Sequence, residues 1–283
     1  MKKVLIANRG EIAIRIARTC NDLGLKTVGI YSEDDANSLH LSKVDEAYKI
    51  DLKGAQAYLD IKEIIRIAKE SKADAIHPGY GFLSENSLFA SAAKRAKIKF
   101  IGPNERTLKI FGDKTSAKEL ASSLNIPVIA GTHEKTSIRK AQSFMKSLKK
   151  NSSVVIKAIS GGGGRGMRVV SKIDDLKESF DRAASEAKAS FDSPDLYLEE
   201  YLKNYRHIEF QIIGDGTGGV SHLHERECSI QRRHQKLIEI APSPSLDLEL
   251  KSKMVEASLA LTQKLKYEGL ATIEFLVNVE KND

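Results

Sequence analysis

The stretch VLIANRGEIAIRIARTCND, Val4–Asp22, decides the fold. It opens with the apolar run Val4–Ala7, which has the length of a buried strand. Gly10 then precedes Glu11–Asp22, in which apolar residues recur at helical spacing. A short strand that leads directly into a helix is the building unit of a parallel sheet. We therefore predict that the chain opens with a β-α unit.

The same alternation continues to about Gly102. We expect strands at 26–31, 73–77 and 98–101, and helices at 61–70 and 85–96. Ligands of such sheets bind at the carboxyl ends of the strands, which here are followed by Asn8–Gly10 and His77–Gly81. The GxGxxG fingerprint is absent after the first strand, which disfavours NAD or FAD. The first part of the chain is predicted to be an α/β, Rossmann-like parallel-sheet domain.

Beyond Gly102 the pattern becomes α+β and mostly antiparallel. We expect helices at 113–124, 137–149, 173–189 and 246–266, and strands at 154–158, 167–170, 196–199, 207–213, 220–224, 237–240 and 270–277, besides a short strand ending at Gly131. The length of 283 residues also suggests about two domains.

The composition narrows the protein class. The chain is 41% hydrophobic and 29% charged, which excludes global disorder. It has no apolar run long enough for a membrane span, and its start lacks the apolar core of a signal peptide, so we expect a cytoplasmic protein. Cys20 and Cys228 fit no disulfide scaffold. The net charge of +7 favours anionic ligands, although surface lysines alone could account for it.

Lys157 is followed closely by the glycine run Gly161–Gly164 and by Arg165. Consecutive glycines cost conformational entropy, but they let backbone N–H groups approach an anion. The loop therefore predicts a polyphosphate site, with a ligand-free surface hairpin as the alternative. The Walker motif GxxxxGK[ST] is absent, so this is not a P-loop.

The segment Glu225–Lys236 is predicted to be a strand-turn-strand crowded with cations. His234 and Lys236 would share one face of an extended chain and form an anion site, unless the segment is a charged edge strand that blocks aggregation. His222, His224 and Cys228 lack the spacing of a zinc site, and nothing marks Cys228 as a nucleophile.

Glu274 lies in an otherwise apolar strand. A buried carboxylate there should meet a cation or Mg²⁺, and simple exposure on a polar face is the alternative.

Taken together, several sequence motifs of the chain resemble those of the biotin carboxylases, which are ATP-grasp enzymes. They are ANRGEIA (7–13), HPGYGFLSEN (77–86), GDK (112–114), GGGGRGM (161–167), RHIEFQ (206–211) and ECSIQRRHQK (227–236). The resemblance implies a Rossmann-like domain over 1–112 and an incomplete ATP-grasp domain over 113–283, with a lid at about 129–201.

The resemblance implies carboxylation of biotin on a biotin carboxyl carrier protein, with ATP, Mg²⁺ or Mn²⁺, and bicarbonate. Bicarbonate would attack the γ-phosphate to give carboxyphosphate and ADP, and the CO₂ released would be captured by the deprotonated ureido nitrogen. Carboxyltransferase subunits would be partners, as in acetyl-CoA carboxylase of fatty acid biosynthesis or in pyruvate and propionyl-CoA carboxylases. Members of the family are commonly homodimers, and the resemblance leaves the oligomeric state of this chain open.

The resemblance also assigns residues. For ATP these are Lys114, Lys157, Gly163, Gly164, Glu199, Glu200, Tyr201, Leu202, His207, Gln231, His234 and Glu274. Lys236 would bind bicarbonate and act with His234 in catalysis, Glu274 would bind the metal, and Tyr80 would border biotin.

Two departures qualify the resemblance. Ile159 is bulkier than the small residue expected before the glycine run. Further catalytic residues of the family are expected beyond Asp283, so a chain that ended there would be inactive on its own.

Two other classes compete with the enzyme. One is a truncated, non-catalytic ATP-binding or regulatory module of the same fold. The other is a basic nucleic-acid binder, which the 6% aromatic content and the absence of Trp disfavour.

Overall fold

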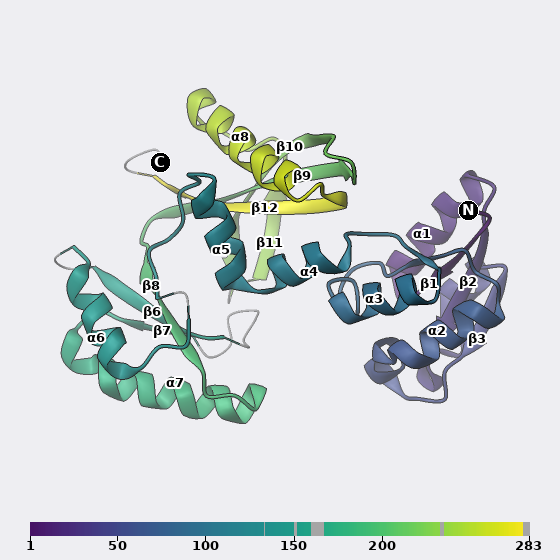
Figure 1. Cartoon of the computed structure of the whole chain (residues 1–283), viewed down its shortest axis with the longest axis horizontal. Coiled ribbons are helices and arrows are strands. Elements are labelled where there is room, and N and C mark those ends of the chain that lie inside the picture. Colours follow the sequence, from purple (N-terminus) through teal and green to yellow (C-terminus); the bar gives the residue numbers. More distant parts are fainter. Residues whose placement is uncertain (133, 150–151, 160–166, 233–234, 280–283) are drawn as a thin grey trace. The chain divides into compact units, whose positions relative to one another are not determined.

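The computed structural model describes residues 1–132, 134–149, 152–159, 167–232 and 235–279. The chain forms two compact units (Figure 1). The first comprises 1–113 together with the short segments 214–219 and 265–270, and the second comprises the rest.

The first unit is built on a parallel five-stranded sheet in the order β3-β2-β1-β4-β5. Its strands are β1 (Lys3–Ile6), β2 (Lys26–Tyr31), β3 (Glu46–Lys49), β4 (Ala75–His77) and β5 (Lys99–Phe100), and its helices are α1 (Gly10–Asp22), α2 (Ile61–Glu70), α3 (Ser87–Arg95) and α4 (Glu105–Gly112). The predicted parallel sheet is confirmed. Strand β3 was not predicted, because EAYK alternates between half-buried and exposed positions and lacks an apolar run.

Helices cover both faces of this sheet. Val4 and Ile6 of β1 pack with Ala13 and Ile16 of α1. Leu5 points to the other face and joins a cluster that includes residues of α2 and α3. Because successive side chains of a strand alternate between faces, a strand covered on both sides is apolar throughout.

The loops that follow β1 and β4 are joined by Asn8. Its buried side-chain amide donates to the carbonyl oxygens of Pro78 at 2.7 Å and Tyr80 at 2.8 Å. β1 also lies between β2 and β4, where the strand order reverses, and such a point is where open α/β sheets bind ligands. Asn8 therefore fixes the backbone of the Tyr80 loop at this edge of the sheet.

Gly79 lies against this amide, which gives a stability prediction. Its φ of +68° is left-handed, and a Cβ would lie 2.6 Å from Asn8 Nδ2. We expect Gly79→Ala to lower the free energy of unfolding in urea by about 3 kcal/mol. Gly81 is the matched control, because its φ of +64° is similar but nothing lies within 4 Å of its added Cβ. Gly81→Ala should cost only about 1 kcal/mol, and equal losses would contradict the clash.

The second unit contains two sheets, one of three strands in the order β7-β6-β8 and one of four in the order β11-β10-β9-β12. The strands are β6 (Ser153–Ala158), β7 (Arg168–Val170), β8 (Leu196–Tyr201), β9 (Tyr205–Asp215), β10 (Val220–Arg232), β11 (Gln235–Ile240) and β12 (Glu268–Asn278), and the helices are α5 (Lys114–Ser123), α6 (Ile138–Ser147), α7 (Leu176–Phe191) and α8 (Leu248–Lys264). The predicted helices and most predicted strands are confirmed. The expected strand ending at Gly131 is reduced to one bridge with Glu199.

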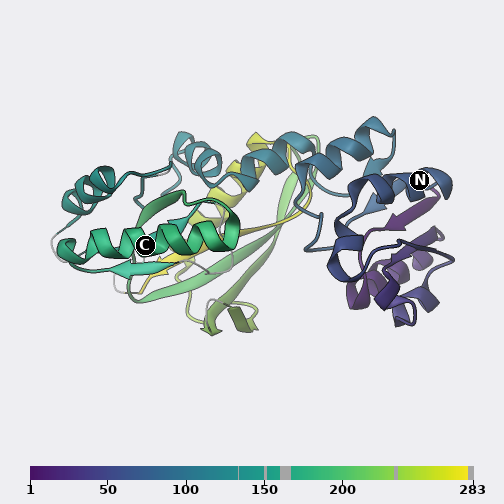
Figure 2. The same ribbon diagram turned by 90° about the horizontal axis from the view of Figure 1, so that it is seen from below.

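Both sheets of the second unit have one apolar face. In the three-stranded sheet, Ile156 and Leu198 pack with Ala183 of α7. This helix lies along the sheet in Figure 2. In the four-stranded sheet, Ile208 and Phe210 pack with residues of α8, which runs beside the sheet in Figure 1. The side chains between these apolar ones alternate to the opposite faces, where the polar groups gather.

Candidate functional site

Glu199 is the centre of the polar face of the three-stranded sheet. The residue is only 5% exposed, and its carboxylate accepts hydrogen bonds from Lys157 of β6 and Lys118 of α5. Burial alone would raise the pKa of Glu199, but the two lysines outweigh it and hold this pKa below its ordinary value. Lys157 and Glu199 were each predicted to contact a nucleotide, and the structure brings the two side chains together.

Lys118 was missed by the sequence analysis. It belongs to no motif, and its only signal is its position one helical turn after Lys114. The structure places it in the same cluster, because its side chain reaches Glu199 and its Nζ lies 6.0 Å from the centre of the Tyr197 ring.

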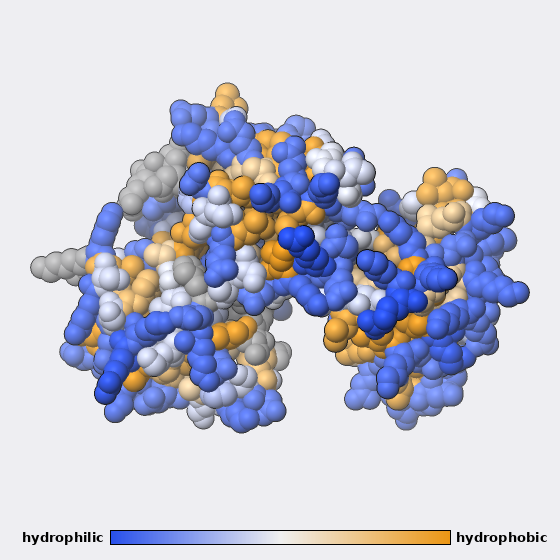
Figure 3. All heavy atoms as spheres, in the orientation of Figure 1, coloured by the Kyte–Doolittle hydropathy of each residue, from blue (hydrophilic) through white to orange (hydrophobic). Residues whose placement is uncertain are grey.

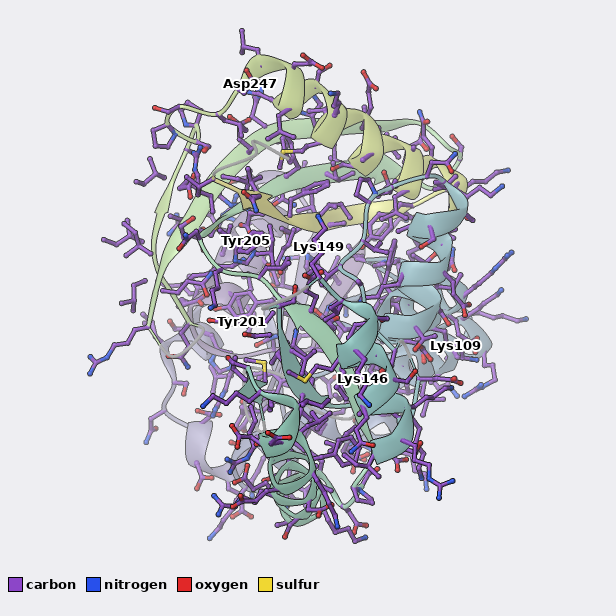
Figure 4. The ribbon with its side chains drawn as sticks, turned by 90° about the vertical axis from the view of Figure 1, so that its left-hand side faces the viewer. Lys109, Lys146, Lys149, Tyr201, Tyr205 and Asp247 are labelled. Carbon is purple, nitrogen blue, oxygen red and sulfur yellow. The ribbon has the colours of Figure 1, made fainter. Side chains whose placement is uncertain are left out.

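The rest of the predicted adenine strand follows Glu199 to the end of β8. Glu200 accepts a hydrogen bond from Ser152 Oγ at 3.0 Å. Tyr201 is the last residue of β8 and is exposed, and Leu202 follows the strand. Tyr201 and Tyr205 lie on either side of the connection from β8 to β9 (Figure 4).

Lys236 of β11 lies on the polar face of the four-stranded sheet between two glutamates. Its Nζ donates to Glu274 Oε1 at 2.7 Å and to Glu209 of β9. Glu209 is buried and also accepts from Arg226 Nε at 2.6 Å. Burial alone would lower the pKa of Lys236, but the hydrogen bonds and charges of both carboxylates outweigh it and raise the pKa, so Lys236 is a fixed cation.

The same face brings His207, Gln231 and Glu274 together. Gln231 Nε2 lies 2.7 Å from His207 Nδ1, and His207 Nε2 lies 3.5 Å from Glu274 Oε2. Glu274 therefore contacts Lys236, the cation that its sequence context requires, and lies beside His207, another predicted site residue. Its side chain is also 52% exposed, so Glu274 is both paired with a cation and partly exposed on the polar face.

Glu274 makes stability depend on pH. Its hydrogen bond with His207, helped by Lys236 against the effect of burial, lowers its pKa from 4.5 to about 2. Because the folded pKa is depressed, this contribution is present above about pH 4.5 and is lost as the pH falls toward 2. Solvent screening of the half-exposed group limits it to the order of 1 kcal/mol.

We therefore expect the free energy of unfolding, measured in urea, to fall less for Glu274→Gln than for wild type between pH 5 and pH 3. All other titrating groups are common to both proteins, so the difference isolates Glu274. Equal losses would contradict the pKa assignment.

The donor groups on this face fit a divalent ion through Glu274. Ligand atoms of His207, Glu209 and Glu274 lie within 4.8 Å of one another. Arg226 and Lys236 occupy both oxygens of the buried Glu209. Glu274 also faces Lys236 and His207, but its side chain is 52% exposed. Mg²⁺ prefers carboxylate oxygens and keeps waters and phosphates as further ligands, so Glu274 is the suitable residue of the three.

Four predicted site residues are described only in part or not at all. Gly163, Gly164 and His234 lie outside the described residues, and Lys114 is described only as the first residue of α5. Tyr80 lies in the first unit, where it is 59% exposed and its hydroxyl donates to Glu11.

Cys228 is buried, and burial first of all raises the pKa of its thiol to about 11. The thiol is therefore protonated at neutral pH, as expected for a residue that is not a nucleophile.

Helices long and apolar enough to cross a bilayer are absent from the described residues. The surface in Figure 3 is predominantly hydrophilic.

Sequence comparison identifies two consecutive family regions. Residues 1–108 match the family described as biotin carboxylase, N-terminal domain, and 113–283 match carbamoyl-phosphate synthase L chain, ATP binding domain. Human mitochondrial pyruvate carboxylase is 48% identical over 281 residues, which are 98% of this chain and 24% of that protein. The chain thus spans about a quarter of the length of this relative.

Two solved structures show the same fold over the chain. The biotin carboxylase–β,γ-ATP complex from Campylobacter jejuni is 42% identical with a TM-score of 0.94, covering 100% of this chain and 63% of that one. The biotin carboxylase domain dimer of Hydrogenobacter thermophilus 2-oxoglutarate carboxylase, in complex with MgADP, ADP and bicarbonate, is 41% identical with a TM-score of 0.92, covering 99% of this chain and 61% of that one. The α/β and ATP-grasp architecture predicted from the sequence is therefore confirmed, and the chain belongs to the biotin carboxylase family, of which it contains the N-terminal and ATP-binding domains.

Proposed function

We propose that the protein containing this chain carboxylates biotin on a carrier protein, at the expense of ATP and with bicarbonate as the carbon source. The observation that best supports this is Lys236, a fixed cation held between Glu209 and Glu274 beside His207. A cation in this position can bind a small anion next to a metal-binding carboxylate. The similar H. thermophilus structure contains MgADP and bicarbonate.

In this reaction a bicarbonate oxygen attacks the γ-phosphorus of ATP, the bond to the β-γ bridging oxygen breaks, and carboxyphosphate and ADP result. Carboxyphosphate then releases CO₂ and phosphate. The released phosphate takes the proton of the biotin ureido nitrogen, and this nitrogen then bonds to the carbon of CO₂. Phosphoryl transfer of this kind depends mainly on positioning and on neutralising charge.

The residues of the chain would supply both. Lys236 would orient bicarbonate, and the buried Glu209 would keep Lys236 in place through its own bond to Arg226. Lys157 would bind phosphate oxygens. Glu274 would hold Mg²⁺ or Mn²⁺, which neutralises phosphate charge when bound.

The remaining predicted roles are part of the same proposal. The phosphates would be contacted by Lys114, Gly163, Gly164 and His234. The adenine edge would be contacted by Glu199, Glu200, Tyr201 and Leu202, and the ribose by His207 and Gln231. Tyr80 would border biotin. The domains would be 1–112 and 113–283, with a lid at about 129–201.

The partners are proposed from the same relatives. They are a biotin carboxyl carrier protein, carboxyltransferase subunits and, as in the H. thermophilus domain dimer, a second copy. Two of the three relatives named above are a pyruvate and a 2-oxoglutarate carboxylase, which does not favour the acetyl-CoA enzyme of fatty acid biosynthesis. The cytoplasmic location stays a prediction.

The test is release of ADP by the protein that contains this chain. We expect a release that requires bicarbonate and rises on addition of biotin, together with transfer of labelled carbon from bicarbonate to biotin. MgATP binding without any turnover would instead identify the non-catalytic ATP-binding module. Failure to bind MgATP would contradict both.

A further inference from the structure

Glu199 holds one lysine on each oxygen of its carboxylate. Lys118 donates to Oε1 and Lys157 donates to Oε2. The Glu199 side chain is 6% exposed, and the two lysine side chains are also largely covered. The lysines come from different elements, because Lys118 lies on α5 and Lys157 on β6.

Two cations are more than one carboxylate needs for neutrality. A single lysine would balance the charge, whereas a buried carboxylate left with none is costly. If Lys157 were the only partner, a nucleotide phosphate could capture it only by leaving Glu199 buried and unpaired. With Lys118 on the other oxygen, Glu199 keeps a cation when Lys157 turns away.

We propose that Lys118 is a positioning residue of the nucleotide site, which holds Glu199 in place while Lys157 exchanges this carboxylate for a phosphate. The inference rests on the proposed function, because it takes Lys157 as a phosphate ligand. It assigns to Lys118 no contact with the nucleotide. Its effect should therefore depend on the phosphates and on the charge of Glu199.

The experiment compares Lys118→Met with Lys118→Arg by isothermal titration. Methionine keeps the unbranched stem beside Tyr197 and removes the charge, whereas arginine restores it. We expect Lys118→Met to bind MgATP about tenfold more weakly and adenosine within about twofold of wild type, since a charge-assisted hydrogen bond contributes about that factor or more. Lys118→Arg should bind MgATP within about threefold of wild type. Thermal unfolding of each variant verifies that it is folded.

A second comparison uses Glu199→Gln as the background. A neutral amide needs no cation, so adding Lys118→Met to Glu199→Gln should change MgATP affinity by less than about twofold. The inference is overturned if Lys118→Met binds MgATP like wild type, if adenosine is weakened equally, or if the loss persists in the Glu199→Gln background. Wild type that binds no MgATP would overturn the proposed function and this inference together. If wild type binds MgATP and Lys118→Met binds it with the same affinity, only the inference is overturned.

Discussion

Replacing Lys236 with alanine should lower kcat/KM for bicarbonate by about 100- to 1000-fold, measured as bicarbonate-dependent ADP release. This is the usual cost of removing one preorganised donor from a site where negative charge develops. Lys236 is held by Glu209 and Glu274, so its charge is already in place before the substrate arrives. The loss should appear in the bicarbonate dependence, while MgATP affinity changes by less than about threefold.

Lys253→Ala is the matched control for this variant. Lys253 on α8 also forms a lysine–glutamate pair, with Glu249 at 2.6 Å, but both residues are exposed and lie outside the site. Its ADP release should equal that of wild type. Activity of Lys236→Ala within tenfold of wild type would refute the bicarbonate role of Lys236.

The second large effect concerns Lys157→Met, which should weaken MgATP binding by about 30- to 100-fold in isothermal titration. Lys157 contributes a charge-assisted hydrogen bond to a phosphate, and its removal leaves no compensating cation on β6. Glu199 keeps Lys118, so the fold should survive the change. The effect should exceed that of Lys118→Met, because Lys118 acts only through Glu199.

Lys188→Met provides the control for this titration. Lys188 lies on α7 and pairs with Asp192 at 2.6 Å on the exposed surface of the same unit. It should bind MgATP like wild type. Equal weakening by both substitutions would indicate a general loss of positive charge, and an unchanged affinity of Lys157→Met would contradict the phosphate contact.

Much of the fold was predictable because hydrophobic periodicity reports the faces of each element. Ile208, Phe210 and Ile212 alternate with His207 and Glu209, so the sequence itself separates an apolar face from a polar one. The unusual carboxylate at Glu274 likewise predicted a cationic partner. Strand β3 was not predicted because it has no apolar run.

The partners within the site could not be predicted, because they depend on strand register and on the placement of a helix. Glu209 and Lys236 are 27 residues apart and meet across the sheet. Register shifts interrupt the pairing of β10 with β11 between Glu227 and Gln231, and these break the simple alternation of faces. Lys118 reaches Glu199 over 81 residues of sequence, which no local pattern records.

The most direct test of the account is a structure of the protein with Mg²⁺ and a non-hydrolysable ATP analogue. We expect phosphate oxygens within hydrogen-bonding distance of Lys157, with Lys118 still on Glu199 and the metal on Glu274. The first unit contains a cavity of about 920 Å³ that is lined by Lys94, Lys97 and Arg106, among others. This cavity is the alternative binding site for the triphosphate. A nucleotide bound there, with Lys157 still paired to Glu199, would contradict the account.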